Sequence, residues 1–272
     1  FLDHAGPAEP PPPGMQVGPH PHIGLQTFTW MIHGEVLHRD SLGSEQIIRP
    51  GQVNLMTAGR GIAHSEESQT TKVHAAQLWI ALPDSHRNIP PRFQHYPDLP
   101  AQQVGDYQAT VLAGESLGLT APAEVHSPLM AVDLHAAASA QPARASFPLR
   151  ADFEHAVMSL SGHVTVEGQH LPEQELFYLP AGTTSVELEC SPDSRLLIIG
   201  GEPMDEAILL WWNFVARTTE EMQQARAQWE AEAATDALTV NGAARRFGPP
   251  VASPLSALHA PSLEGVALRA SK

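Results

Sequence analysis

The sequence has little cysteine, few aromatic residues and few basic residues, and each shortage excludes a class of protein. One of its 272 residues is cysteine, which rules out a disulfide scaffold and a thiolate metal cluster. Aromatic residues make up 6% of the chain, and this low content together with 25 prolines argues against a helical bundle. Lys and Arg number 15 against 30 Asp and Glu, so the net charge of −15 argues against direct binding to nucleic acid, which needs a basic surface.

Long apolar runs are absent as well. No stretch reaches the roughly 18 consecutive apolar residues of a transmembrane helix. The sequence also lacks the basic, apolar and small-residue pattern of a secretion signal. We therefore expect no membrane partner and a cytoplasmic location.

What the sequence does contain is a succession of short strand-like runs separated by Gly and Pro turns, at roughly the spacing typical of an all-β sandwich or barrel. The predicted strands are 25–32, 52–56 and 73–82 in the first half, and 106–113, 127–134, 157–160, 164–166, 175–179, 186–190 and 196–199 in the second. Residues 83–100 hold five prolines and are the best candidate for a linker or a long crossing loop. The pattern predicts two β-rich domains, 1–100 and 101–272.

The tail of the chain has a different period. The segment Thr218-Thr219-Glu220-Glu221 is similar to a capping box, and helix-forming residues follow it as far as Ala234. Met222, Ala225 and Trp229 lie on one stripe at helical spacing. We expect a helix near 218–234 that packs on a sheet of the second domain.

Histidine is the residue in excess. The 15 histidines equal all Lys and Arg together, and nine of them lie in the first 95 residues. His20-Pro21-His22 and His64-Ser65-Glu66 are pairs with a spacing of two, which places both side chains on one face of a strand. Two such pairs on neighbouring strands can converge into a set of three histidines and one carboxylate, which suits Fe(II), Ni(II), Mn(II), Cu(II) or Zn(II).

Other interpretations of the histidines stay open from the residues alone. His20 and His22 can cap a turn between prolines, with Glu66 a solvated carboxylate. His33 and His38 flank the turn at Gly34, and we expect both at the surface. The second half has no His pair at this spacing, which predicts a metal-free, structural domain.

Two segments resemble the pirin family, a branch of the cupin superfamily: His20-Pro21-His22-Ile23-Gly24-Leu25-Gln26-Thr27, and Met56 through Glu66 with Gly59-Arg60-Gly61 at its centre. Leu2-Asp3-His4, Gln77-Leu78-Trp79 and Gly114-Glu115 extend the resemblance over nearly the whole chain. It implies two tandem jelly-roll (cupin) β-barrels with a C-terminal helix. It also implies metal ligands at His20, His22, His64 and Glu66. The chain departs from the general cupin pattern at Gln26, where a Glu is usual, and at Thr57, where a Pro is usual.

The resemblance implies a quercetin 2,3-dioxygenase-type enzyme that opens a flavonol ring with O2 at one divalent metal. Fe(II) is the first expectation for that metal, with Ni, Mn, Cu, Zn and Co as alternatives. Glu66 would act on the proton of the substrate. Gln26 would support a ligand, and His4 and His74 would line the mouth of the pocket. As the alternative, the resemblance also implies a non-enzymatic metal- or redox-sensing regulator that binds a protein partner. A purely structural metal is a third interpretation.

Overall fold

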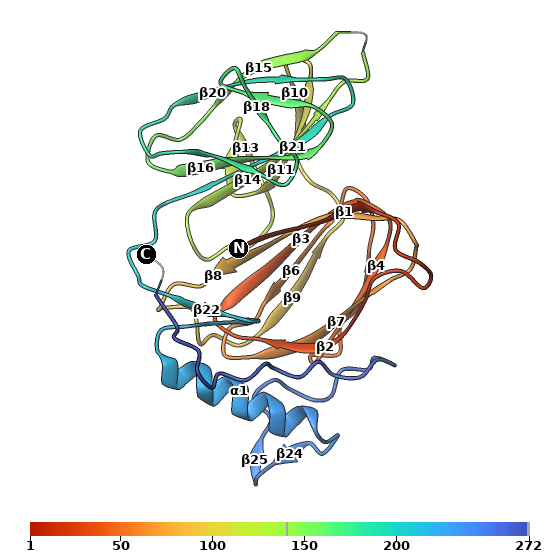
Figure 1. Cartoon of the computed structure of the whole chain (residues 1–272), viewed down its shortest axis with the longest axis vertical. Coiled ribbons are helices and arrows are strands. Elements are labelled where there is room, and N and C mark those ends of the chain that lie inside the picture. The colour runs from red at the N-terminus through yellow and green to blue at the C-terminus, as the bar shows by residue number, and fades with distance from the viewer. Residues whose placement is uncertain (140, 271–272) are drawn as a thin grey trace. The chain divides into compact units, whose positions relative to one another are not determined.

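Strands dominate the computed structural model, which describes residues 1–139 and 141–270 (Figure 1). The described chain divides into two compact units. The first unit joins residues 1–95 to residues 204–272, and the second contains residues 96–203. The prediction of an all-β chain with one C-terminal helix is confirmed.

The first unit is built from two facing groups of antiparallel strands. One sheet has the order β1-β8-β3-β6-β9, and the other has the order β2-β7-β4-β5. Their bounds are β1 Leu2–Ala8, β2 Gln16–His22, β3 Leu25–His33, β4 Val36–Asp40, β5 Glu45–Ile48, β6 Val53–Thr57, β7 Ile62–Ser68, β8 Val73–Ala81 and β9 Arg92–Tyr96. The composition of β3, with Thr, Phe, Trp and Ile, suits a pleated surface that is buried over most of its length.

The second unit repeats this plan. Its larger sheet has the order β10-β11-β14-β21-β16-β19, and its smaller sheet has the order β15-β20-β17-β18. The bounds are β10 Ala101–Val104, β11 Tyr107–Ala113, β12 Glu115–Ser116, β13 Leu119–Thr120, β14 Leu129–Ala136, β15 Ala143–Pro148, β16 Glu154–Ser161, β17 Val164–Val166, β18 Gln169–Leu171, β19 Leu176–Leu179, β20 Ser185–Cys190 and β21 Arg195–Gly201. The strands predicted in both halves of the sequence are present.

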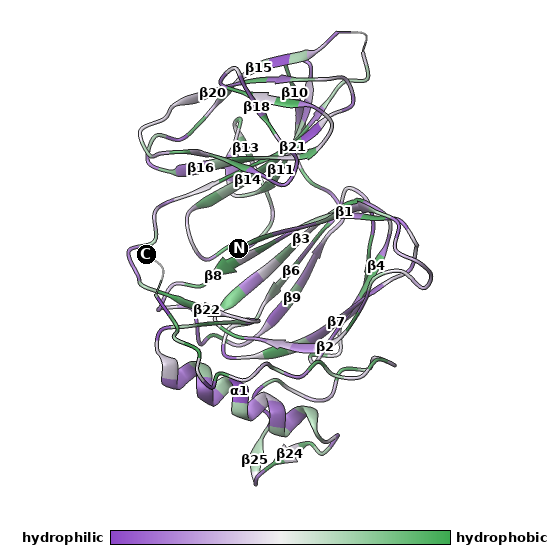
Figure 2. Ribbon diagram, viewed as in Figure 1, coloured by the Kyte–Doolittle hydropathy of each residue, from purple (hydrophilic) through white to green (hydrophobic). Residues whose placement is uncertain are grey.

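The predicted helix is present as α1, Thr219–Ala233. The Thr218 side chain caps it by accepting a hydrogen bond from the backbone N–H of Glu221. Met222, Ala225 and Trp229 are buried, as the stripe predicted. The alternation of hydrophilic and hydrophobic residues along α1 is visible in Figure 2.

The domain assignment of this helix differs from the prediction. The described tail also forms β22 Leu209–Trp211, β23 Phe214–Ala216, β24 Thr239–Val240 and β25 Ala243–Ala244. The apolar face of α1 shares a buried cluster with Ile23 and Ala63 of the first unit. Residues 204–272 therefore complete the first unit, because that is where the apolar stripe of the helix is buried.

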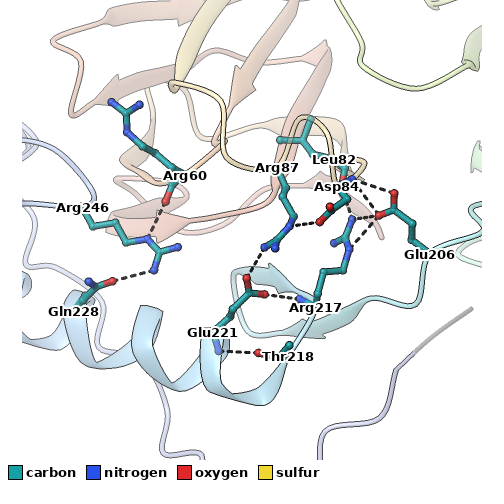
Figure 3. A network of polar contacts seen from close by, with 10 residues as sticks. All are labelled: Arg60, Leu82, Asp84, Arg87, Glu206, Arg217, Thr218, Glu221, Gln228 and Arg246. Atoms are coloured by element: carbon teal, nitrogen blue, oxygen red, sulfur yellow. Dashed lines mark hydrogen bonds and ion pairs between the residues drawn. The ribbon is translucent and has the colours of Figure 1, made fainter.

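Charged side chains hold the tail to residues 1–95 of the same unit (Figure 3). Arg217 pairs with Glu206 at 2.5 Å and donates a hydrogen bond to the carbonyl of Leu82 at 2.8 Å. Arg87 pairs with Glu221 of the helix at 2.5 Å. These contacts fix both ends of the segment that carries the β22–β23 hairpin.

The segment 83–100 is more than a linker. It contains β9, which joins the β6 edge of the first sheet, and the boundary between the units falls at the end of β9.

No described helix is long and apolar enough to cross a membrane.

Candidate metal site

Three histidines meet where β2 and β7 pair. The two strands are antiparallel, with His20 opposite His64, and His22 follows His20 on the same face. One ring nitrogen from each of the three lies within 4.8 Å of the other two, and the Nε2 atoms of His22 and His64 are 3.1 Å apart. All three side chains are buried. The first sequence pair and His64 of the second therefore converge, through the pairing of their strands.

Backbone carbonyls orient two of these rings. The Nδ1–H of His20 donates to the carbonyl of Gly18 at 2.9 Å, and the Nδ1–H of His22 donates to the carbonyl of Asn213 at 3.0 Å. A carbonyl only accepts, so it places the proton on Nδ1 and leaves a lone pair on Nε2. Both rings are therefore arranged to bind a cation through Nε2.

Burial keeps the histidines neutral. It lowers the pKa of His20 to about 4, against the opposing effect of the Gly18 carbonyl. Burial, reinforced by the neighbouring histidines, holds the pKa of His22 and His64 well below the ordinary value. Neutral imidazole is the form that binds a metal, and nitrogen donors suit Fe, Ni, Cu and Zn. The residues present thus fit a divalent transition metal.

Glu66 lies beside this group and is held by Gln77. The Gln77 side-chain amide donates to both carboxylate oxygens of Glu66, at 3.0 and 3.3 Å, and to the Thr29 hydroxyl at 3.1 Å. Its oxygen accepts a hydrogen bond from the indole N–H of Trp79 at 2.9 Å, which fixes the orientation of the amide. Burial raises the pKa of Glu66, and His38 and the Gln77 hydrogen bond oppose that rise. Glu66 is outside the three-histidine group found among the described residues.

A cavity of about 240 Å³ adjoins the site. His20, Glu66, Gln77 and Trp79 lie on its wall. Most of the remaining wall is apolar, with contributions from Met15, Val17, Met31, Val36, Val73, Ala75 and Leu258. An apolar wall with a few convergent polar groups is typical of a small-molecule site.

The tail contributes to the same cavity through the turn of the β22–β23 hairpin. Trp212 and Asn213 line it, and Trp212 has a φ of 50°, which few non-glycine residues adopt. Gly24 lets β23 approach the end of β2, because a Cβ at that position would lie 2.2 Å from the carbonyl oxygen of Val215. The sequence gives no side-chain signal for Asn213, since its contribution is a backbone carbonyl.

Three further predicted residues lie elsewhere. Gln26 is buried and donates to the Thr57 hydroxyl at 2.9 Å. His4 and His74 contact each other, Nε2 to Nε2, at 2.8 Å. Neither histidine lines the cavity. The residues before and after each of them in the strand do line it, and adjacent residues of a strand face opposite ways.

The surface location expected for His38 is wrong, whereas His33 is exposed as expected. The His38 ring is buried and stacks on Phe93 with 4.2 Å between ring centroids. Its Nδ1 lies 3.3 Å from Nδ1 of His64, and its Nε2 lies 3.2 Å from the Asp40 carboxylate. The spacing of two in His38-Arg39-Asp40 was the signal that could have revealed this pair.

Comparison with known proteins agrees with this architecture. The Pirin family profile matches residues 1–80, and the profile of the Pirin C-terminal cupin domain matches residues 131–234. The chain belongs to the pirin family. This pirin is 52% identical over 235 residues to a candidate quercetin 2,3-dioxygenase of Pseudomonas aeruginosa, covering 85% of this chain and 73% of that protein. It is 38% identical over 243 residues to a pirin-like protein of Caulobacter vibrioides, covering 85% and 82%.

Among solved structures, this pirin is similar to a quercetin 2,3-dioxygenase from Acinetobacter baumannii. The TM-score is 0.91 and the identity 49%, over 100% of this chain and 87% of the other. The tandem cupin architecture expected from the sequence is therefore confirmed.

Proposed function

We propose that this pirin is a metal-dependent dioxygenase of the quercetin 2,3-dioxygenase type. One cavity carries the proposal. Its wall holds the ring of His20, which belongs to the three-histidine group, together with the buried carboxylate of Glu66 and an apolar surface. The names of the relatives above support the substrate class, a flavonol. We propose His20, His22 and His64 as metal ligands, with Glu66 as the carboxylate beside them.

The overall reaction adds both atoms of O2 to the flavonol and releases its C3 carbon, with the 3-hydroxyl oxygen, as carbon monoxide. Two ring C–C bonds break, and the remaining product is a depside that carries both new oxygen atoms. A bound divalent metal would supply Lewis-acid and redox chemistry to the substrate and to O2. Fe(II) is our first choice, with Ni, Mn, Cu, Zn and Co as alternatives.

Glu66 accepts the proton of the substrate 3-hydroxyl and later returns it to the product. A raised pKa brings a carboxylate closer to the working pH of the enzyme, which is favourable for a general base. Gln77 holds the carboxylate in place through both oxygens, and Trp79 holds Gln77. The apolar wall packs against the part of the flavonol that enters the cavity and excludes water from the reacting end.

The size of the cavity limits how the substrate enters. Its volume of about 240 Å³ is below the roughly 300–1,000 Å³ usual for sites that enclose a drug-sized ligand. The oxygen-bearing end of the flavonol would therefore occupy the cavity, while the rest extends through the mouth. The same volume is the observation that favours the second candidate, a cytoplasmic metal- or redox-sensing regulator that binds a protein partner.

An aerobic quercetin assay separates the two candidates. Protein loaded with Fe(II), and separately with Ni(II), should remove the flavonol absorbance and release carbon monoxide. Glu66→Gln should keep its metal and lose about 10²–10⁴ in kcat. A fully loaded wild-type protein that leaves quercetin intact would overturn the enzyme proposal and favour the regulator.

A further inference from the structure

The turn of the β22–β23 hairpin contains a residue that does not suit its backbone. Trp211 pairs with Phe214, so the turn has two central residues, Trp212 and Asn213. The φ angle is positive at Trp212, where it is 50°, but not at Asn213. A two-residue turn with a positive φ at its first central position favours glycine there. The tryptophan strains the backbone, and strain of this kind is typical of functional sites.

The backbone of the turn does not explain why a tryptophan is present. The carbonyl of Asn213 accepts the Nδ1–H of His22 at 3.0 Å, and a glycine at position 212 would leave that carbonyl in the chain. The hairpin is held to the end of β2 by a hydrogen bond from the backbone N–H of Val215 to the carbonyl of Ile23 at 3.1 Å. Neither contact uses an indole. What the strained position supplies is therefore the side chain of Trp212.

That side chain lies on the wall of the cavity beside the metal site, as Glu66 does. Phe214 supports it in an edge-to-face contact, with 5.4 Å between ring centroids. The indole is partly exposed, and its N–H has no hydrogen-bond partner among the described residues. Trp79, on the same wall, already donates its N–H to Gln77 at 2.9 Å. Of these two indoles, Trp212 is the one that can still donate to a ligand.

We propose that Trp212 is a specificity-determining residue that binds an oxygen-bearing aromatic ring of the substrate. The inference rests on the proposed function, because a flavonol has flat rings with oxygen atoms at their edges. The Trp212 N–H donates to one of these oxygens, and the apolar remainder of the indole packs against the neighbouring carbon atoms. A phenyl ring at this position can only pack, and a glycine can do neither.

These differences define two variants. Calorimetry with quercetin on Ni(II)-loaded protein under nitrogen measures binding without turnover. Trp212→Phe keeps an aromatic ring and loses the N–H, so we expect quercetin to bind about 3–10-fold more weakly. Trp212→Gly suits the turn and loses the whole indole, so we expect binding about 10–100-fold weaker. The Ni(II) affinity of both variants should equal that of the wild type, because Asn213 keeps its carbonyl.

Trp211→Phe is the matched control. Trp211 is the preceding residue, is also partly buried, and is not on the wall of the cavity. This variant should bind quercetin and Ni(II) like the wild type. Wild-type quercetin affinity in Trp212→Gly would overturn the inference, and so would an equal loss in Trp211→Phe. A parallel loss of Ni(II) and quercetin affinity in Trp212→Gly would also overturn it, because the turn rather than the indole would then be responsible.

The aerobic assay adds a readout that a merely structural role would not give. A residue that binds the substrate away from the reacting atoms affects KM and not kcat. We expect the KM of Trp212→Gly to rise by about the same 10–100-fold, with kcat unchanged and Trp212→Phe intermediate. A lower kcat at an unchanged KM would contradict the inference.

The binding experiment also separates the inference from the proposed function. Wild-type protein that binds quercetin but does not consume it would refute the dioxygenase and leave the comparison of the Trp212 variants to decide the inference. Active wild-type enzyme with Trp212 variants of equal affinity would refute the inference and leave the dioxygenase to stand. Wild-type protein that binds no quercetin would refute both.

Discussion

The two barrels share one strand plan and use it for different purposes. The smaller sheet is β2-β7-β4-β5 in the first unit and β15-β20-β17-β18 in the second, with the same antiparallel pairing at its edge. In the first unit that pair holds His20 opposite His64. In the second it holds Ala143 opposite Cys190 and Phe147 opposite Val186, all buried in an apolar cluster.

The difference shows what a buried polar site requires from its surroundings. The histidines of the first barrel have acceptors for their ring N–H groups, and one acceptor, the carbonyl of Asn213, comes from the tail. The matching strands of the second barrel fill their space with apolar side chains, which need no partners. Its metal-free state remains a prediction.

The largest effect should come from His22→Ala, which removes one of the three nitrogens. We expect Ni(II) binding to become undetectable by calorimetry, while His163→Ala, an exposed histidine of the second unit, binds like wild type. Full binding by His22→Ala would show that the metal is held somewhere else.

The second barrel should depend on its apolar filling alone. Phe147→Ala should cost about 3–5 kcal/mol of the free energy of unfolding of that unit, through lost burial and a cavity. Cys190 is the only cysteine and is buried in the same cluster as Phe147, so its reaction rate with a thiol reagent reports opening of this unit. An unchanged labelling rate would contradict the assignment of this core.

Lowering the pH should destabilise the first barrel more than the second, which is the next largest effect. The pKa of His20 is 6.5 in the unfolded chain and about 4 in the folded apo protein. The unfolded state therefore binds more protons between these values, and stability falls as the pH drops from 6.5 to 4, by of order 3 kcal/mol for this group. His22 and His64 add to the effect in the same direction.

All five tryptophans lie in the first unit, so tryptophan fluorescence during urea unfolding follows that unit. Thiol labelling of Cys190, divided by the labelling rate of the unfolded protein to remove the pH dependence of the thiol itself, should show a weaker pH dependence. The described part of the second unit has a histidine with a pKa lowered by burial, His155, but no group of three buried histidines. Equal slopes from the two probes would contradict the comparison.

The smallest effect should come from Trp79→Phe, which keeps an aromatic ring but removes the hydrogen bond to Gln77. One hydrogen bond contributes about 1 kcal/mol, and Gln77 would then be free to turn its oxygen toward Glu66. We expect the acid limb of the pH–rate profile to move to higher pH, because Glu66 loses a donor. An unchanged profile would show that Gln77 needs no support.

Sequence analysis could predict the parts of this molecule that depend on local pattern. Strand-like runs between Gly and Pro turns predicted the strands, a capping sequence predicted the helix, and the spacing of two predicted that His20 and His22 share one face of a strand. The same rule, applied to His38-Arg39-Asp40, would have found the contact between His38 and Asp40. The partner of the helix could not be predicted, because an apolar stripe shows that a face is buried but not which sheet buries it. The acceptor at Asn213 is a backbone atom, for which side-chain chemistry gives no signal.

The most direct test is anomalous diffraction from crystals of the wild-type protein loaded with Ni(II). The account predicts one strong peak per chain, within roughly 2.0–2.2 Å of Nε2 of His20, His22 and His64, and none within the second barrel. A peak among residues 96–203, or a loaded protein with no peak at the three histidines, would contradict it.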